Sequence, residues 1–257
     1  MTISSMKTFL RRGKWSNSIG EAVLVTITEV GELHRKDGKA NQDFADGMLS
    51  QSNIRLSVAD GLGSCRYAEI GAQTAVEVIM QLPLEQISLD KEELTARLVD
   101  SWRSSLPDAK YAKDYDTTLL FASLEQDKLI LGQIGDGLIQ WKIGEGPTNE
   151  LEVAEGAFSN QTVSIAGNSL KDMLQTRTVN IGPNEVPIIV ILATDGISGD
   201  LDPNLRRALP SILLESLKEK GIEETVRELE IWVSDWKTPC HTDDRTFAFL
   251  TVLKKED

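Results

Sequence analysis

The sequence predicts an α+β layered domain, and three observations support this fold class. Strand candidates in the middle of the chain follow one another through short turns, which predicts antiparallel neighbours. The helical stretches come in two pairs separated by groups of strands, an order typical of layered α+β proteins and not of a doubly wound parallel sheet. No linker or low-complexity tract divides the 257 residues. We therefore expect one domain over residues 1–257, with residues 1–20 as a basic N-terminal extension packed on it.

Seven segments are predicted to be strands. Most of them carry β-branched or aromatic residues and are bounded by Gly, Asp or Pro. They are 21–30, 54–60, 117–124, 128–135, 138–143, 187–195 and 245–253. The third, fourth and fifth are joined by short turns, so we expect these three to pair with one another in order.

Four segments are predicted to be helices. In 66–82, small and apolar residues recur at steps of three and four, so that one helix face can lie close to a sheet. Residues 91–105 form the second helix of this pair. Near the other end of the chain, Pro210 suits the first turn of a helix that stops at Gly221. Residues 222–236 follow with an apolar stripe along one face.

The charge balance and the rare residue types exclude several classes of protein. With 27 Lys and Arg against 40 Asp and Glu, the net charge is −13, so we expect no nucleic-acid partner and no attraction to an anionic membrane surface. No stretch has the roughly 18–20 apolar residues of a transmembrane helix. Cys65, Cys240, His34 and His241 are too few and too scattered for a structural zinc site or a disulfide framework. We expect a cytoplasmic protein whose metal, if it binds one, is a hard cation held by oxygen.

Carboxylates stand at the ends of several predicted strands. Asp60, Asp136 and Asp195 each follow an apolar strand and precede a glycine, which lets the backbone come close to a ligand. Asp43 and the pair Asp243-Asp244 are further candidates. Carboxylates that gather in one place need a cation to neutralise them, so the pattern predicts Mg²⁺ or Mn²⁺. For the second Asp-Gly pair, which has a strand on either side, a simple hairpin turn is an equally good explanation.

Other phosphatase and hydrolase chemistries do not match the sequence. A cysteine phosphatase needs an arginine after five intervening residues, but Cys65 is followed there by Gly71, and Cys240 reaches Arg245 after only four. No Gly-x-Ser-x-Gly elbow and no Walker loop is present. These absences are consistent with a reaction that needs no covalent enzyme intermediate.

The order of the acidic motifs resembles the PPM (PP2C-type) metal-dependent protein phosphatases, and among them a compact bacterial branch. The resemblance spans about residues 21–253, and Ala-Thr-Asp-Gly after a buried strand is its most specific motif. The motifs are Asn41-Gln42-Asp43, Val58-Ala59-Asp60-Gly61, Asp116-Thr117-Thr118, Ile134-Gly135-Asp136, Leu192-Ala193-Thr194-Asp195-Gly196 and Asp243-Asp244-Arg245-Thr246. The resemblance implies two packed antiparallel sheets flanked by helix pairs. It also implies hydrolysis of phosphoserine and phosphothreonine by water activated on two Mn²⁺ or Mg²⁺ ions.

The same resemblance assigns roles to individual residues. Asp60 matches the carboxylate that bridges the two metals, and the carbonyl of Gly61 matches a ligand of one of them. Asp195 and Asp243 match the remaining ligands of the other metal. Asp60 and Asp195 are therefore the residues on which catalysis is expected to depend.

Three further acids complete the expected site. Asp43 matches an acid that holds metal-bound water, and Asp136 matches a third, weaker metal site. Asp244 stands where many family members carry Asn, so we interpret it as a neighbour of the site and not as a ligand.

The sequence departs from the family at the residue that grips phosphate. Many members carry an arginine shortly before the first acidic motif, and here Gly38 stands five residues before Asp43. Arg35 is the expected substitute, because a guanidinium can bind two phosphate oxygens at once. The alternatives are Lys36, Lys39 and Arg66.

Two functions therefore remain open. The first is an active phosphatase whose partners are phosphorylated proteins, with a protein kinase or its targets among them, since this branch often stands beside kinases. The second is a catalytically impaired PP2C-fold module that binds phosphoproteins or regulates them. Retention of all the strand-end acids favours the phosphatase, and the missing arginine favours the module. We expect a monomer in either case.

Overall fold

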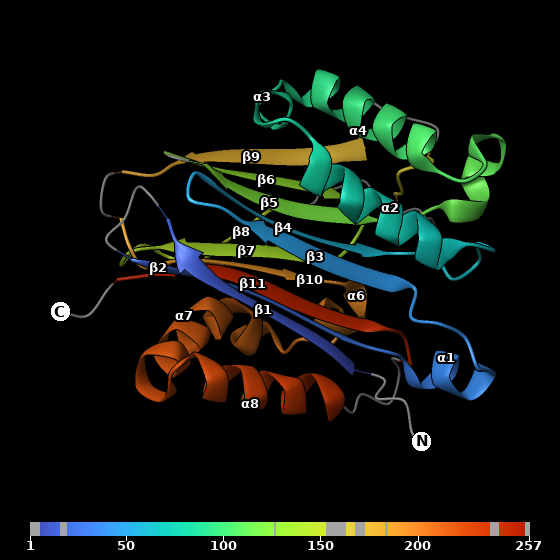
Figure 1. The fold of residues 1–257 in the computed structure, drawn as a ribbon. Helices are drawn as coiled ribbons and strands as arrows, with labels where there is room; N and C mark the ends of the chain where they lie inside the picture. Colours follow the sequence, from blue (N-terminus) through green and yellow to red (C-terminus); the bar gives the residue numbers. More distant parts are fainter. Residues whose placement is uncertain are drawn as a thin grey trace.

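Two antiparallel sheets pack face to face in the computed structural model, and helices cover the outer side of each sheet (Figure 1). The structure describes residues 6–15, 20–125, 127–152, 163–167, 173–182, 185–236 and 242–254. This arrangement confirms the predicted α+β class and the sandwich that the resemblance implies.

The first sheet has six strands in the order β1-β2-β11-β10-β7-β8. Its strands are β1 (Met6–Lys14), β2 (Glu21–Glu29), β7 (Leu138–Ile143), β8 (Asn149–Glu150), β10 (Ile188–Ala193) and β11 (Arg245–Leu253). The second sheet has five strands in the order β3-β4-β5-β6-β9. Its strands are β3 (Asp43–Leu49), β4 (Asn53–Asp60), β5 (Leu119–Glu125), β6 (Lys128–Ile134) and β9 (Leu174–Asn180).

Two helix pairs form the outer layers, as Figure 1 shows. The pair α2 (Ala68–Gln81) and α4 (Lys91–Ser105) covers the five-stranded sheet, and the pair α7 (Pro203–Lys220) and α8 (Ile222–Ser234) covers the six-stranded one. The short helical segments are α1 (Glu32–Asp37), α3 (Leu84–Ile87), the 3₁₀ segment η1 (Ala109–Tyr115) and α6 (Asp195–Ser198). None of the described helices has the length and apolar character that crossing a membrane requires.

The buried apolar residues form three layers that follow from this architecture. One layer lies between the two sheets, and one lies under each helix pair. Strands in the middle of a sheet are consequently buried on both faces, as in β10, where every residue is buried. Such strands read as continuous apolar runs, which is why the sequence revealed them.

All seven predicted strands are present, and four further strands among the described residues were missed. The missed strands are β1, β3, β8 and β9. All four lie at the edges of their sheets. Edge strands are partly exposed and can carry polar residues and glycine, so β3 (DFADGML) and β9 (LQTRTVN) lack the apolar run of a central strand. The predicted N-terminal extension contains β1, which pairs with β2 along its whole length.

The prediction for the strands around Asp136 was partly wrong. β5 and β6 are antiparallel neighbours, as expected, but β6 and β7 belong to different sheets. Gly135 and Gly137 have φ angles of 90° and 118°, which residues with a Cβ rarely adopt. These glycines let the chain turn from one sheet to the other, so Asp136 does not stand in a β-hairpin.

The predicted start of the third helix was also wrong. α7 begins at Pro203, where the carboxylate of Asp202 accepts hydrogen bonds from the next backbone N–H groups, and not at Pro210. Pro210 lies inside the helix and cannot donate to the carbonyl of Arg206, four residues earlier. The side-chain amide of Gln140 donates to that carbonyl instead, at 2.8 Å. The lost helical hydrogen bond is thus replaced from β7, and the helix continues.

Candidate active site at the edge of the sandwich

The predicted acids come together at one edge of the sandwich, where strands of both sheets begin or end. Asp43 is the first residue of β3 and lies directly opposite Asp60, the last residue of β4. Asp195 is the first residue of α6, two residues after the end of β10, and Asp243 lies two residues before β11. Asp136 occupies the crossing between β6 and β7. Five segments that are distant in sequence therefore contribute one carboxylate each.

The pKa values of these acids reflect their crowding and burial. Burial first, and then the negative charge of Asp244, raises the pKa of Asp43 to about 8. Burial also raises the pKa of Asp60 well above its ordinary value, and the charges of Asp43 and Asp195 add to this effect. The pKa of Asp195 is raised by burial, then by Asp136 and Asp243. The five acids are thus linked electrostatically, with Asp195 affected by both Asp136 and Asp243.

Asp60 stands in the middle of the group. Its carboxyl group interacts with that of Asp43 on one side and with that of Asp195 on the other. Within the part of the chain that the structure describes, no ion pair joins Asp43, Asp60, Asp195 or Asp243 to a lysine or arginine. Oxygen donors with excess negative charge are what a hard divalent cation requires. The donor set therefore fits Mg²⁺ or Mn²⁺.

Asp43 is fixed by residues on either side of the site. The hydroxyl of Thr194 donates to Asp43 Oδ2 at 2.8 Å and accepts from the backbone N–H of Thr246 at 3.0 Å. The side chain of Asn41 accepts from the backbone N–H of Asp43 at 2.9 Å. The threonine of the Ala-Thr-Asp-Gly motif thus ties β3 of one sheet to β10 and β11 of the other.

Two threonines of a different motif hold the backbone of Asp60. The Thr118 hydroxyl accepts from the Asp60 N–H at 2.9 Å, and the Thr117 hydroxyl donates to the Asp60 carbonyl at 2.8 Å. The following residue, Gly61, donates its N–H to the carbonyl of Gln42 at 3.1 Å. The end of β4 is therefore clamped at its amide and its carbonyl, which sets the position of the Asp60 side chain.

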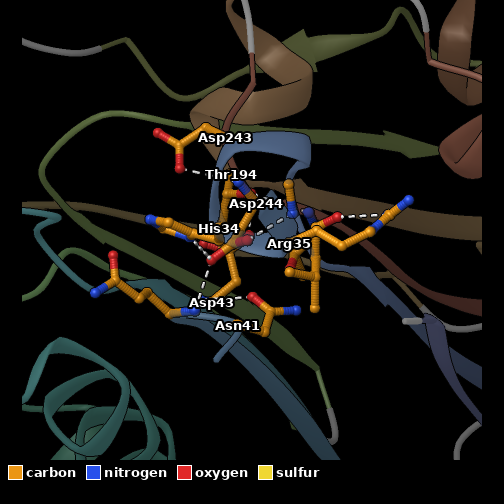
Figure 2. A network of polar contacts seen from close by, with 11 residues as sticks. His34, Arg35, Asn41, Asp43, Thr194, Asp243 and Asp244 are labelled. Atoms are coloured by element: carbon orange, nitrogen blue, oxygen red, sulfur yellow. Dashed lines mark hydrogen bonds and ion pairs between the residues drawn. The ribbon is translucent and has the colours of Figure 1, made fainter. Parts of the chain in front are cut away.

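Asp244 connects three segments behind the acids (Figure 2). Its Oδ1 accepts from the backbone N–H of Gly31 at 2.7 Å, and its Oδ2 accepts from the N–H of Gln42 at 2.6 Å. Oδ2 also lies 2.9 Å from Nδ1 of the buried His34. Possible ligand atoms of His34, Asp243 and Asp244 lie within 4.8 Å of one another. Because both oxygens of Asp244 already accept hydrogen bonds, we interpret it as a positioning residue.

Two glycines allow the Asp243-Asp244 segment to pass between its neighbours. A Cβ on Gly31 would lie 2.3 Å from the carbonyl oxygen of Thr242, and one on Gly196 would lie 2.0 Å from that of Asp244. No real Cβ atom tolerates such contacts. The glycine after Asp195 is therefore required because the backbone of a neighbouring segment lies against it.

Three of the four basic residues considered for phosphate binding have other contacts. The guanidinium of Arg35 donates to Glu29 Oε1 at 2.5 Å and to the Val30 carbonyl at 2.9 Å, and Figure 2 shows it directed away from Asp43 and Asp243. Lys36 pairs with Glu32 at 2.7 Å. Arg66 lies over the ring of Tyr67, in the loop between β4 and α2. The structure thus does not bring Arg35 to the acids in the arrangement described.

Several positioning residues were not assigned a role from the sequence. Thr194, Thr117 and Thr118 lie inside quoted motifs, but their hydroxyl groups were not singled out, and Asp244 was treated only as a neighbour. The available signal was that Thr194 and Asp244 each adjoin a predicted site acid; Thr117 and Thr118 carried no such signal beyond their motif. Cys240 and His241, two of the four residues judged too few and too scattered for a zinc site, lie outside the described residues.

An αββα sandwich with five acids at one edge defines a recognisable class of protein. A family model described as protein phosphatase 2C matches residues 30–233. Because this match covers most of the chain, the protein belongs to the protein phosphatase 2C family. None of the curated proteins compared with the sequence matches it.

Solved structures share the fold at low sequence identity. A bacterial serine phosphatase superposes with a TM-score of 0.63 at 16% identity, covering 91% of this chain and 98% of that one. RsbX in complex with magnesium gives 0.61 at 16% identity, with 95% and 100% covered. The catalytic domain of the serine/threonine phosphatase PstP with two manganese ions gives 0.55 at 14% identity, with 97% and 99% covered. At these identities the likeness establishes the fold.

Proposed function

We propose that this protein is a Mg²⁺- or Mn²⁺-dependent protein phosphatase that hydrolyses phosphoserine and phosphothreonine in other proteins. The observation that carries the proposal is the group of five carboxylates at one edge of the sandwich, in which burial and neighbouring acids raise the pKa values of Asp43, Asp60 and Asp195. Such a group is costly to assemble unless cations neutralise it. Membership of the phosphatase family and the Mg²⁺ and Mn²⁺ complexes of RsbX and PstP support the choice of chemistry.

The central position of Asp60 suits it to contact two cations at once. In this proposal Asp60 and the carbonyl of Gly61 serve one ion, and Asp60 shares the other with Asp195 and Asp243. Asp136, at the exposed end of the group, serves a third ion. When bound, two such ions would lower the pKa of a shared water and neutralise charge on the phosphoryl group.

The protein's own contribution is to hold its carboxylates still and to orient water. Asp43 accepts the Thr194 hydroxyl with Oδ2, which fixes the direction of its carboxyl group toward the site. From there Asp43 can accept a hydrogen bond from the attacking water. The Thr117 and Thr118 contacts keep Asp60 at its place between Asp43 and Asp195. No nucleophilic side chain is needed.

The exposed end of the site suits a phosphorylated residue on another protein. Asp136 and Asp243 are exposed, while Asp43 is buried. A phosphoryl group on a serine or threonine can therefore approach from the solvent side. The guanidinium of Arg35 could orient this phosphoryl group only after its ion pair with Glu29 breaks. Proteins that a kinase has phosphorylated in the cytoplasm are the proposed substrates.

The test is hydrolysis of a phosphothreonine peptide as a function of Mn²⁺ concentration. We expect turnover that saturates with Mn²⁺, stops with a chelator, and is lost in Asp195→Asn. Asp100→Asn, which removes an exposed carboxylate on α4, is the matched control and should keep full activity. If the wild-type protein binds Mn²⁺ and the phosphopeptide without turning it over, it is the binding module instead. Turnover that is insensitive to chelator would overturn the metal-dependent reaction.

A further inference from the structure

The edge strand β1 combines open backbone groups with an unusual concentration of positive charge. β1 pairs with β2 through nine residues, from Met6 opposite Glu29 to Lys14 opposite Glu21. No described strand pairs with its other side. In an antiparallel sheet, such an outer edge presents N–H and carbonyl groups to which another extended segment can hydrogen-bond.

The charge of β1 is opposite to that of the chain as a whole. Its nine residues, MKTFLRRGK, hold four cations and no carboxylate, although the chain carries −13. Arg12 is paired with Glu21 and Glu223. Lys7, Arg11 and Lys14 are exposed, and none of them forms an ion pair with another described residue.

Exposed apolar surface lies among these cations. Leu10 is 37% exposed, and the guanidinium of Arg11 lies 4.5 Å from the ring centre of Phe9. An added strand would therefore find both charge and apolar contact on β1. Charged residues on an edge also prevent sheets of two copies from joining. A second copy of β1 would bring four further cations close to these four, which disfavours self-pairing as the use of this edge.

We propose that β1 is a docking edge for an acidic, extended segment of the phosphoprotein substrate, which adds to the six-stranded sheet as a further strand. This inference rests on the proposed function and deepens it. Backbone hydrogen bonds to β1 would supply affinity. Selectivity would come from Asp or Glu side chains on the face of the sheet that Lys7 and Arg11 share, and from an acid near Lys14 on the opposite face.

β1 begins at the end of the sandwich that holds the carboxylate group. Met6 is opposite Glu29, and Glu29 is opposite Arg245, which follows the Asp243-Asp244 pair. In Figure 1 the beginning of β1 lies toward α1, at the end of the sandwich that holds the acids. Strands lie about 4.8 Å apart, so an added strand would be about 14 Å from Arg245. About four to six extended residues at roughly 3.4 Å each span that distance.

A specific substrate pattern follows from this geometry. An added strand antiparallel to β1, the slightly more stable pairing, would run toward Met6 with its C-terminal end. The phosphorylated residue should therefore lie about four to six residues after the acidic segment. A substrate with the acidic segment on the other side of the phosphorylated residue should gain less.

Docking can be measured without catalysis, on the metal-free protein. The probe is a fluorescent peptide of about eight residues in which Glu alternates with Thr and Val, residues that favour strands, and the reference probe has Gln for Glu. We expect the Glu peptide to bind about tenfold more tightly, with an affinity that falls as salt rises. The triple variant Lys7→Gln, Arg11→Gln, Lys14→Gln should lose this difference. Equal binding of both peptides by the wild-type protein would overturn the proposal.

Two controls separate strand addition from general attraction between opposite charges. A variant with Arg97→Gln, Lys128→Gln and Lys218→Gln removes three exposed cations elsewhere and should bind the Glu peptide as the wild type does. The second control changes the peptide. In an added strand, the N–H groups of only every second residue point toward β1. N-methylation of those residues should abolish binding, and N-methylation of the residues between them should not. Equal losses in the two protein variants, or equal effects of the two methylations, would contradict the docking edge.

The same segment should then improve hydrolysis. Joined by five residues to a phosphothreonine, it should lower KM by about tenfold in the wild type but not in the β1 variant, with kcat unchanged. If the metal-free binding results hold and no hydrolysis occurs, the proposed function fails and the docking edge stands. If hydrolysis occurs with the same KM for the Glu and Gln peptides, docking to β1 is wrong and the phosphatase stands.

Discussion

The two ends of the carboxylate group differ in how firmly the protein holds them. At the inner end, Asp43 is buried and bonded to Thr194, and Asp60 is clamped through its backbone by Thr117 and Thr118. At the outer end, Asp136 and Asp243 are exposed, and Asp136 lies in a turn between two glycines. In the proposed site, the inner acids raise the cost of folding without a cation and fix where a cation binds. Of the exposed acids, Asp243 completes the set of ligands, whereas Asp136 adjusts a site that the others form.

Replacement of the central acid should have the largest effect. Asp60→Asn keeps the size of the side chain but removes the charge that lies between Asp43 and Asp195, so we expect kcat to fall by at least about a thousandfold and the binding of two Mn²⁺ ions to be lost. The metal-free variant should be at least as stable as the wild type, because a buried charge has been removed. Turnover assays, calorimetric Mn²⁺ titration and thermal unfolding check these three outcomes. Normal turnover in Asp60→Asn would show that the inner end is not the metal site.

The stability of the metal-free protein should depend on pH in the direction set by the inner acids. The folded-state pKa of Asp43 is raised to about 8, above its value in the unfolded chain. Between these two values the folded protein binds the extra proton, so stability falls as pH rises from about 4 to about 8. Asp60 and Asp195, whose pKa values are also raised, act in the same direction. Thermal unfolding in chelator at a series of pH values measures this slope.

Saturating Mn²⁺ should reduce that pH dependence, because ions that bind the deprotonated carboxylates replace the protons. In Asp43→Asn the slope should also be shallower. A metal-free protein that becomes more stable between pH 5 and pH 8 would contradict the assignment of the raised pKa values to this group.

The sequence predicted which acids the fold brings together more completely than it predicted the edges of the fold. Asp60, Asp136 and Asp195 were recognisable because each follows an apolar strand, and buried central strands stand out in a sequence. The edge strand β3 was not recognisable, because the apolar residues of DFADGML follow neither the two-residue period of a strand nor the 3.6-residue period of a helix. Asp43 itself was nevertheless predicted to belong to the site. The change of sheet at Asp136 could not be foreseen either. A short glycine-containing link between two strands looks the same whether the strands pair or separate.

Contacts between distant segments were the other limit. Asp244 contacts residues more than 200 positions away, and nothing in its own neighbourhood indicates that both of its oxygens face N–H donors. The hydrogen bond from Gln140 to the Arg206 carbonyl, which Pro210 leaves without its helical donor, is another contact between distant segments. Local patterns predict elements and strand-end acids, and such pairings across the fold require the structure.

Asp244→Asn should have an intermediate effect and would test whether the inner end depends on its supports. An amide offers one acceptor oxygen, but Asp244 accepts from Gly31 on one oxygen and from Gln42 on the other. One N–H would then face an NH₂ group, so we expect a loss of about 1–3 kcal/mol in unfolding free energy. Because Gln42 precedes Asp43, Mn²⁺ affinity should fall by about 10–100-fold. Titration calorimetry and denaturant unfolding measure the two effects. Unchanged Mn²⁺ affinity together with the stability loss would make Asp244 purely structural.

Asp136→Ala should have a smaller effect, because it changes the outer end. We expect two Mn²⁺ ions to bind as in the wild type and kcat to fall by about tenfold, the size expected for a residue that adjusts an assembled site. Mn²⁺ titration and turnover distinguish three results. Activity near normal would mean that Asp136 serves only the crossing between β6 and β7, and loss of both ions would mean that the outer end is as essential as the inner one.

Arg35→Ala should have the smallest effect and would decide whether the outer end includes a phosphate-binding group. The side chain of Arg35 is 51% exposed and is held by Glu29, so part of any gain from binding phosphate is offset by breaking that pair. We therefore expect KM for a phosphothreonine peptide to rise by about two- to threefold, with kcat and Mn²⁺ affinity unchanged. Arg66→Ala, in the loop after Asp60, is the matched comparison. A larger rise in KM for Arg66→Ala would place the phosphate-binding group in that loop. If neither variant changes KM, the carboxylate-bound ions alone orient the phosphoryl group, and the protein has dispensed with the arginine that many family members use.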